Sequence, residues 1–321
     1  MDEFEIIRRY FERAVSDDSI RVGIGDDGAV LRPDPGRDLI CVIDTLVAEV
    51  HFPKSLAPAD IGYRSVAVNL SDIAAMAGRP RWMLLALTLS DADPAWLEGF
   101  ANGLFTAAEE FDLVLVGGDT TRGKETVISI QILGDVGVDQ ALTRGGAEPG
   151  DLIYVTGTPG DASAGLAVLH SGAPRNPDVD YLVNRFARPK ARVHVGQAIA
   201  AQASAAIDLS DGLFSDIEKL LKASGVSGSI ELAELPLSSP LIKLMGEDDA
   251  LRFALGGGDD YELCFTATAS AQVIQDIADQ HAVAITCIGQ VNDRSAAATA
   301  LVCTRNGDEY DYQHGGYRHF H

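Results

Sequence analysis

The chain has 321 residues, 46% of them hydrophobic, which is enough for two globular domains that each bury a core. It carries 47 Asp and Glu residues against 25 Lys and Arg residues, for a formal net charge of −22. Such an acidic protein lacks the basic field that binds nucleic acid, so nucleic acid is excluded as a partner. An anionic nucleotide can still bind if divalent metal ions carry the countercharge.

No apolar run approaches the roughly 20 residues that a membrane span needs. The charged, helical start does not have the pattern of a signal peptide. The four cysteines (Cys41, Cys264, Cys287 and Cys303) form no C-x-x-C pair, and Cys41 and Cys264 lie inside apolar runs. We therefore expect reduced core cysteines in a soluble, cytoplasmic protein without a membrane partner.

Helices and strands alternate in the first half of the chain. Phe4, Ile7, Tyr10 and Phe11 share one face of a predicted helix over residues 4–13. The elements that follow are extended runs near 29–31 and at 38–48, a helix at 58–78, a strand at 81–89 expected to be buried on both faces, a helix at 94–111, and strands at 112–121 and 126–136. This order predicts an α+β layer with helices packed on one face of a mixed sheet.

A loop rich in Gly and Pro at 143–151 indicates a domain boundary, so we expect domains at 1–146 and 147–321. The second half predicts strands at 151–157, 204–210 and 284–291, helices at 161–172, 211–225 and 271–282, and a glycine turn entering a strand at 256–268.

Several aspartates stand in apolar surroundings rather than on charged helix faces. They are Asp44 within a strand, Asp72 on a helix, Asp119 at the end of a strand, Asp208 and Asp211 around the turn IDLSDG, and the pair Asp26–Asp27 in a glycine turn. A buried, isolated charge costs several kcal/mol, and the chain has too few cations to pair all of its carboxylates. Because every candidate ligand is an oxygen, Mg²⁺ fits best, with more than one ion around a polyphosphate.

The segment 21-RVGIGDDGAV-30 matches the spacing G-x-G-x-x-G of dinucleotide-binding loops. Such a loop must lead into a helix, but here an extended run and two prolines follow, and two carboxylates would repel phosphate. We interpret the turn as a metal clip. A phosphate loop of the Walker type is also absent, because the G-K pair in TRGKET lacks the upstream glycine.

Three further residues are weaker candidates for phosphate contacts. His51 follows a strand, Arg144 lies in a glycine-rich loop, and Ser210 stands beside a predicted helix start whose N–H groups could receive phosphate. Taken alone, Ser210 and Asp211 could equally be a plain helix N-cap.

The motifs together resemble the thiamine-monophosphate kinase family, in order along nearly the whole chain. They are GIGDDGAV, DTLVAEVHF, AVNLSDIAAMAG, VGGDTTRG, LTRGGAEPGD, YVTGTPGD, AIDLSDGL, GGGDDYELCF and GGYRHF. This family belongs to the ATP-binding superfamily that includes aminoimidazole ribonucleotide synthetase and selenophosphate synthetase. The resemblance implies an α/β N-terminal domain that dimerises through its sheet and an α+β C-terminal domain. It also implies conversion of thiamine monophosphate to the diphosphate with ATP and several Mg²⁺ ions.

The resemblance also implies roles for individual residues. As metal ligands it implies Asp27, Asp44, Asp72, Asp119, Asp208 and Asp211; as ATP contacts Gly118, Asp119, Arg144 and Ser210; and as contacts to thiamine phosphate His51, Asp259 and Tyr317. The chain departs from the family at Val42–Ile43, where many relatives carry hydroxyl residues, at Asp259, where glutamate is common, and at Tyr317, where some relatives have tryptophan.

The acceptor implied by the resemblance is a phosphate monoester with a second pKa near ~6, so no general base is needed for direct transfer of the γ-phosphoryl group. Two alternatives remain at this point. One is a sister enzyme of the superfamily acting on another small molecule, although no cysteine stands where selenophosphate synthetase would need one. The other is a nucleotide-binding regulatory dimer without turnover.

Overall fold

The computed structural model describes residues 1–14, 17–294 and 300–312. The chain splits into two compact units. Unit 1 comprises residues 1–73 and 78–140, and unit 2 comprises residues 74–77 and 141–321.

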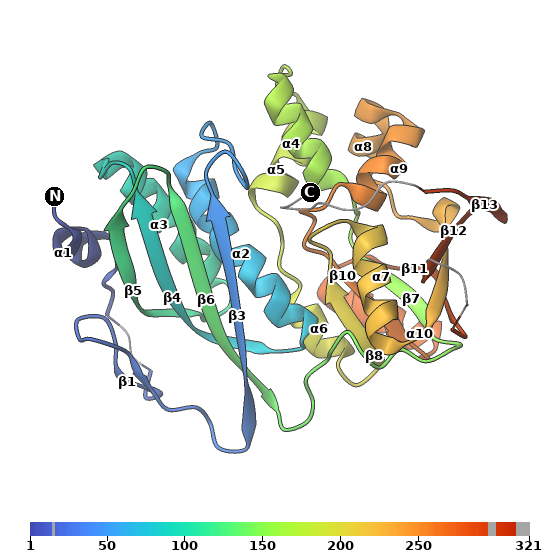
Figure 1. Ribbon diagram of the computed structural model, residues 1–321, viewed down its shortest axis with the longest axis horizontal. Helices are drawn as coiled ribbons and strands as arrows, with labels where there is room; N and C mark the ends of the chain where they lie inside the picture. Colours follow the sequence, from blue (N-terminus) through green and yellow to red (C-terminus); the bar gives the residue numbers. More distant parts are fainter. Residues whose placement is uncertain (15–16, 295–299, 313–321) are drawn as a thin grey trace. The chain divides into compact units, whose positions relative to one another are not determined.

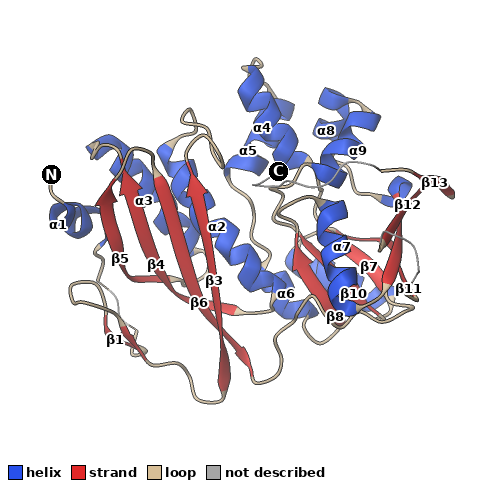
Figure 2. Ribbon diagram, viewed as in Figure 1, coloured by secondary structure: helices blue, strands red, loops and turns tan. Residues whose placement is uncertain are grey.

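Unit 1 is built on a four-stranded sheet in the order β3-β6-β4-β5 (Figure 2). Its strands are β3 (Arg37–Val47), β4 (Arg79–Leu89), β5 (Val114–Arg122) and β6 (Val127–Gly137). β6 is antiparallel to β3 and to β4, whereas β4 and β5 are parallel. β3, β4 and β5 therefore run in the same direction, and their carboxyl ends lie at one edge of the sheet. A separate two-stranded ribbon pairs β1 (Ile20–Val22) with β2 (Val30–Leu31).

Two helices, α2 (Pro58–Ala75) and α3 (Pro94–Glu109), cover one face of this sheet (Figure 1). α3 begins at the N-cap Asp93, whose carboxylate accepts a hydrogen bond from the Ala95 N–H, with Pro94 at the first helical position. The two helices touch through glycine: a Cβ on Gly103 would lie 1.7 Å from the Ala59 carbonyl oxygen. The predicted helices and strands of this half, and the mixed sheet with helices on one face, are confirmed.

Among the described residues, no helix of unit 1 covers the other face of the sheet (Figure 1). Along β3 the buried residues Ile40, Val42 and Leu46 alternate with exposed residues, and Ile43 is 64% exposed. The expectation that the strand at 81–89 is buried on both faces was wrong, because Ala86 is exposed on this open side. Cys41 is also exposed, so its assignment to the core was wrong, whereas Cys264 is buried and all four cysteines are free. An apolar run in a strand does not reveal that only one of its faces is covered.

The opening helix consists of α1 (Glu3–Ile6) and a π-helical turn, η1 (Ile7–Phe11). The predicted helix is therefore present, but its apolar face differs from the expectation, because Phe4 is 66% exposed while Ile6 and Phe11 are buried. A π turn has a longer repeat than 3.6 residues, so it rotates Phe11 out of line with Phe4. Phe11 packs edge-on against Phe100 of α3, with ring centroids 6.3 Å apart.

Unit 2 is built on a seven-stranded sheet in the order β13-β12-β9-β11-β7-β10-β8. Its strands are β7 (Leu152–Thr156), β8 (Ala203–Asp208), β9 (Ser227–Glu231), β10 (Leu263–Ala267), β11 (Ile285–Asn292), β12 (Leu301–Arg305) and β13 (Asp308–Tyr310). Only the β9–β12 pair is parallel among these described strands. The core of this unit centres on Val155, Leu220, Leu221 and Cys264.

The helices of unit 2 are α4 (Asp161–Ser171), α5 (Pro177–Ala187), α6 (Val193–Ile199), α7 (Leu213–Ser224), η2 (Leu232–Glu234), α8 (Ser239–Met245), α9 (Glu247–Gly256) and α10 (Ala271–His281). A second apolar cluster, which includes Leu182 and Leu241, joins α4, α5, α8 and α9. The α+β expectation is confirmed, but α5, α6, α8, α9, β9, β12 and β13 were not predicted.

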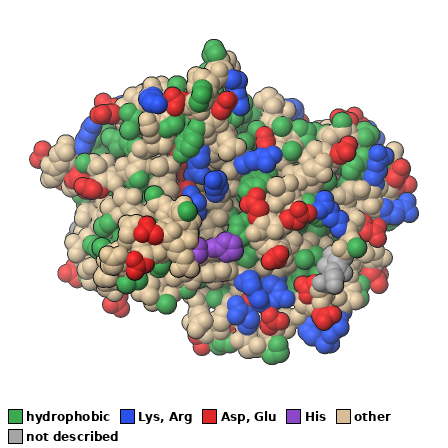
Figure 3. Space-filling view, turned by 180° about the vertical axis from the view of Figure 1, so that it is seen from behind, with side chains coloured by type: hydrophobic (Ala, Val, Ile, Leu, Met, Phe, Trp, Pro, Cys, Tyr) green, Lys and Arg blue, Asp and Glu red, His purple; other side chains and the backbone are tan. Residues whose placement is uncertain are grey.

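On the face shown in Figure 3, acidic and basic side chains are interspersed with apolar ones. None of the helices in the described ranges has the length and apolar character needed to cross a membrane.

Candidate active site

Two predicted ligands of unit 1 lie near the edge where β3, β4 and β5 end. Asp44 stands three residues before the end of β3, and Asp119 stands three residues before the end of β5. The pairing runs from Asp44 through Ile130 and Leu85 to Gly118, so the two aspartates lie at nearly the same height on the sheet. The carboxyl ends of parallel strands are common ligand-binding positions in sheets of this kind.

Asp44 is the carboxylate of unit 1 that most needs a cation. Asp44 is half-buried and lies on the same face of β3 as the buried residues Val42 and Leu46. Burial raises its pKa above the ordinary value. It makes no hydrogen bond or ion pair with any residue that the structure describes. Because desolvation disfavours the ionised form, a bound cation would stabilise the carboxylate at this position.

Asp119 cannot share an ion with Asp44 within one chain. β3 and β5 are the two edge strands, separated by β6 and β4, so the two residues stand about 14 Å apart at ~4.8 Å per strand. Before Asp119, Gly118 adopts φ +153°, and a Cβ there would lie 1.9 Å from the Leu85 carbonyl oxygen. Only glycine allows β5 to approach β4 this closely.

The glycine turn places its two aspartates in different situations. The Asp26 carboxylate accepts a hydrogen bond of 2.8 Å from the Asp27 N–H. No described residue bonds the Asp27 carboxylate, and both aspartates are exposed. Gly25 has φ +116°, a backbone conformation that residues with a side chain rarely adopt, so the turn needs glycine at this position. This geometry favours Asp27 over Asp26 as a ligand.

His51 and Asp72 complete the predicted residues of unit 1. His51 lies in the turn after β3, where its Nδ1 accepts a hydrogen bond of 3.0 Å from the Val47 N–H. That bond helps to fix the orientation of the imidazole ring. Asp72 is half-buried, three residues before the end of α2.

In unit 2, two turns bring four predicted residues together: Asp208, Ser210, Asp211 and Asp259. Asp208 ends β8 and pairs with Leu263 at the start of β10. The Asp259 N–H donates to the Ser210 carbonyl oxygen (2.9 Å), and the Tyr261 N–H donates to that of Leu209 (2.9 Å).

Two side chains of α7, Asp216 and Lys219, hold the turn that precedes this helix. One oxygen of the buried Asp216 accepts hydrogen bonds of 3.0 Å from both the Ser210 and the Asp211 N–H groups. Lys219 donates to the other oxygen of Asp216 at 2.7 Å and also pairs with Asp211. The N–H groups of Ser210 and Asp211 are therefore already bonded. The N-cap is Gly212, so the expectation of a Ser210 or Asp211 cap was wrong, whereas phosphate binding at the start of α7 stays a prediction.

Two buried carboxylates support the turn that carries Asp259. Asp260 accepts hydrogen bonds from the Gly160 N–H (2.7 Å) and the Ala162 N–H (3.1 Å), and desolvation raises its pKa to about 8. Burial alone would raise the pKa of Glu262, but Arg192 and Arg185 outweigh it and lower that pKa to about 2. The two carboxylates thus fix the path of the chain on the carboxyl side of Asp259.

Arg144 is not brought to these turns. Its carbonyl oxygen accepts a hydrogen bond from Ser224, the last residue of α7, whereas Ser210 and Asp211 precede the start of that helix. The 12 residues of α7 span about 18 Å at 1.5 Å per residue. Tyr317 lies outside the described residues.

The residues present fit Mg²⁺ in their donor chemistry, since each is an oxygen ligand and Asp44 is a desolvated carboxylate without a countercharge. Within the described ranges, no group of three or more His, Cys, Asp or Glu side chains is close enough to hold a metal ion. Mg²⁺ usually takes only one or two protein carboxylates and completes its shell with water and phosphate, so separate pairs of carboxylates suffice for it.

Comparisons with known proteins decide the family. Residues 25–136 match the N-terminal domain of AIR synthase related proteins, and residues 148–300 match the C-terminal domain of that family. The chain is 47% identical over 322 residues to the thiamine-monophosphate kinase of Escherichia coli (strain K12), covering 99% of this chain and 98% of that protein. The chain belongs to the thiamine-monophosphate kinase family.

Solved structures agree with this assignment. The thiamine-monophosphate kinase of Stenotrophomonas maltophilia K279a is 40% identical, with a TM-score of 0.85 and 96% of each chain covered. The structure of AaThiL complexed with AMPPCP and TMP is 31% identical, with a TM-score of 0.79 and 92% of each chain covered.

The structure gives physical reasons for two departures from the thiamine-monophosphate kinase pattern. Val42 is buried and Ile43 is exposed, and both lie on the edge strand β3. On an edge strand one of two successive backbone carbonyl groups points away from the neighbouring strand. Such a carbonyl oxygen is available to bind a ligand where a relative has a hydroxyl group. Asp259 has φ +64°, in the left-handed region where aspartate is enriched among non-glycine residues.

The sequence analysis did not identify the residues that support the turns carrying Asp211 and Asp259. Asp216 and Lys219 carry a recognisable signal, an acid and a base three residues apart in the first turns of a helix that follows a candidate ligand. Glu262 and its two arginines carry none, because Arg185 and Arg192 are about 70 residues away in sequence and reach Glu262 only through the fold.

Proposed function

We propose that this protein transfers the γ-phosphoryl group of ATP to thiamine monophosphate and so forms thiamine diphosphate, the last step of its biosynthesis, in the cytoplasm. The observation that carries the proposal is the 47% identity to a thiamine-monophosphate kinase over nearly the full length of both chains. A relative of similar fold complexed with AMPPCP and TMP supports ATP and thiamine monophosphate as the two substrates.

The chemistry needs positioning more than proton transfer. The acceptor phosphate has a second pKa near ~6 and is already deprotonated at neutral pH, so no general base is required. Several Mg²⁺ ions, when bound, would screen the repulsion between the two polyanions. Asp27, Asp44, Asp72, Asp119, Asp208 and Asp211 would hold these ions. Gly118, Asp119, Arg144 and Ser210 would contact ATP, and His51, Asp259 and Tyr317 would contact thiamine phosphate.

Direct in-line transfer predicts inversion at phosphorus. Turnover with ATP that is chiral at the γ-phosphate should invert the configuration, because no phosphoenzyme intervenes. Net retention would require a covalent intermediate and would overturn this part of the proposal.

We also propose a homodimer formed through the open face of the sheet in unit 1. Supporting it, Leu39 and Ile43 on that face are 48% and 64% exposed. Residues 1–146 would then form the ATP- and metal-binding, dimerising domain, and residues 147–321 would complete the substrate site. Sedimentation of Ile43→Asp should show monomers where the parent chain sediments as a dimer.

The test of the activity is direct. The protein is incubated with ATP, Mg²⁺ and thiamine monophosphate, and ADP and thiamine diphosphate are measured. ADP release with another small molecule but not with thiamine monophosphate would favour a sister enzyme, and ATP binding without any turnover would favour a regulatory dimer.

A further inference from the structure

The ribbon formed by β1 and β2, which carries the turn with Asp27, has little structure of its own. Its two strand pairs are separated by an irregular register, and residues 25–28 of the turn are exposed. Within the described ranges, no hydrogen bond or ion pair joins residues 20–31 to the four-stranded sheet. An isolated ribbon of two short strands is at best marginally stable in water, so its order depends on how its two ends are held.

The end of the ribbon before β1 is tied to the sheet by a buried hydrogen bond. The Trp82 Nε1–H on β4 donates to the Ser19 hydroxyl oxygen at 3.1 Å, and both residues are buried. The Asp17 carboxylate accepts a hydrogen bond of 2.8 Å from the Ser19 N–H. Just after β2, the Arg32 N–H donates to the Ser19 carbonyl oxygen at 2.7 Å. Ser19 therefore joins both strands of the ribbon to β4.

The end of the ribbon after β2 is tied to the same part of β4 by ion pairs. The Asp34 carboxylate accepts hydrogen bonds from Arg79 at 2.7 Å and from Arg81 at 2.9 Å. Both arginines also bond the fully buried Asp135, so their guanidinium groups are held in place from the sheet side. A proline stands on each side of Asp34 and restricts the backbone of this segment. The start of β4 thus holds both ends of the ribbon, and these contacts together form the anchor.

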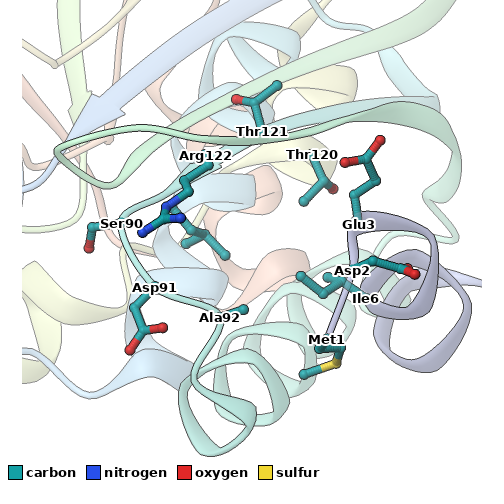
Figure 4. A pocket seen from close by; sticks show the side chains of 11 residues that line it. Met1, Asp2, Glu3, Ile6, Ser90, Asp91, Ala92, Thr120, Thr121 and Arg122 are labelled. Atoms are coloured by element: carbon teal, nitrogen blue, oxygen red, sulfur yellow. The ribbon is translucent and has the colours of Figure 1, made fainter.

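The anchor stands at the opposite end of β4 from the sheet edge where β4 and β5 end. β4 runs from Arg79 to Leu89, about 33 Å at ~3.3 Å per residue. At its far end lies a pocket of about 440 Å³, with Arg122 and Glu3 in its wall (Figure 4). The side chains of the anchor are distant from that pocket and are bonded to one another. They can therefore influence a ligand only through the ribbon that they hold.

We infer that Ser19 and Asp34 are positioning residues for the metal-binding turn, because they hold the base of the ribbon against β4 and so keep Asp27 in place for a cation. The inference rests on the proposed function, which takes Asp27 as a ligand. A ligand group that is in place for only a fraction of the time binds with an apparent dissociation constant raised by the inverse of that fraction. Loosening the anchor should therefore weaken Mg²⁺ binding and leave phosphoryl transfer unchanged once Mg²⁺ saturates.

The variant that opens the anchor combines Ser19→Ala, which removes the acceptor of Trp82, with Asp34→Asn. The matched control is Asp249→Asn, which breaks an exposed ion pair with Arg252 in unit 2. The Mg²⁺ concentration for half-maximal activity should rise about three- to ten-fold in the double variant, as expected if the turn is in place about 10–30% of the time. The kcat at saturating Mg²⁺ should match that of the control. Replacing Asp34→Asn by Asp34→Glu in the double variant should restore much of the Mg²⁺ dependence.

Limited digestion with trypsin gives a readout that does not depend on activity. The exposed Arg21 on β1 offers a cleavable bond, whereas a proline follows Arg32 and blocks cleavage there. Without ligand, cleavage after Arg21 should be at least about five-fold faster in the double variant than in the parent, because native-state cleavage follows the population of the open ribbon. Mg²⁺ with AMPPCP should slow this cleavage in the parent, and the double variant should need more Mg²⁺ for the same protection.

Three results would overturn the inference. Equal cleavage rates in the parent and the double variant would show that Ser19 and Asp34 do not hold the ribbon. Faster cleavage with an unchanged Mg²⁺ requirement would show that the order of the ribbon does not affect metal binding. A lower kcat at saturating Mg²⁺, or a melting temperature well below that of the control, would indicate a general structural role. If the parent protein shows no turnover, the proposed function fails, and the Mg²⁺ dependence of cleavage still tests the anchor separately.

Discussion

Two carboxylates on the same sheet of unit 1, Asp135 and Asp44, differ in their ion-pair partners and in the direction of their pKa shifts. Asp135 lies on β6, opposite Arg79 at the amino end of β4, and has no exposed side-chain surface. It accepts hydrogen bonds from Arg37, Arg79 and Arg81 at 2.5 to 3.1 Å. Burial alone would raise its pKa, but these arginines lower it. Asp44, toward the other end of the sheet, has no such partner among the described residues, and its pKa is raised.

The difference separates a structural carboxylate from a functional one. Where the chain supplies its own cations, the carboxylate joins strands and stabilises the fold. Where it supplies none, burial of the carboxylate costs free energy that only a cation from outside can offset. Perturbed carboxylates of this kind are candidates for functional sites.

Replacing Asp44 should give the largest effect on catalysis. Asp44→Asn should lower kcat by roughly 10²–10³-fold, as expected when a group that stabilises transition-state charge is lost. The free energy of unfolding without Mg²⁺ should stay the same or rise slightly, because an unpaired carboxylate is removed. Initial rates and urea denaturation check both, with the exposed Asp18→Asn as control. Near-normal turnover would remove Asp44 from the site.

Replacing Asp135 should show the reverse pattern. Asp135→Asn leaves three arginines without their shared acceptor and should cost about 3 kcal/mol of stability, with little change in kcat per folded molecule. Asp34, a half-exposed partner of Arg79 and Arg81, provides the control, and Asp34→Asn should cost much less stability than Asp135→Asn because solvent screens its ion pairs. A fall in kcat without a loss of stability would contradict the structural role.

The pH dependence of stability should distinguish two neighbours in unit 2. Glu262 has a pKa of about 2, below its unfolded value, so its stabilising effect is present above pH 4.5 and is lost as pH falls toward 2. Asp260 has a pKa raised to about 8, so stability should fall as pH rises from about 4 to about 8. Urea denaturation at pH 5, 6.5 and 8 should show this fall in the parent chain and a flatter profile in Asp260→Asn. Equal slopes would show that Asp260 does not titrate in this range.

The smallest effect is expected at Lys219, whose side chain is 36% exposed. Lys219→Met removes the cation from the buried Asp216 and should cost about 1 kcal/mol, while Lys219→Arg should restore most of it. Lys222→Met, which breaks only an exposed pair with Glu218, should change stability by about 0.3–0.5 kcal/mol. Equal losses in the two Met variants would mean that Lys219 is no more than a surface charge.

Local patterns predicted most of the elements that flank the candidate site. α2, α3 and β3 have strong periodicity and clear start signals, so their positions follow from residues close in sequence. α5 and α6 were missed although their helices are well formed, and the open face of the sheet was missed because apolar strand residues look the same whether or not a helix covers them.

The sequence by itself determined the fold class, the family, and the set of aspartates too numerous for the chain's own cations, since these depend on residue identity and short-range spacing. Only the tertiary structure decided which carboxylates are already neutralised. Asp211 and Asp44 were both predicted as ligands from the sequence; in the structure Asp211 pairs with Lys219, whereas no described residue pairs with Asp44. A carboxylate's charge balance depends on groups brought near it through strand order and helix packing, and that proximity is set by the fold rather than by distance along the chain.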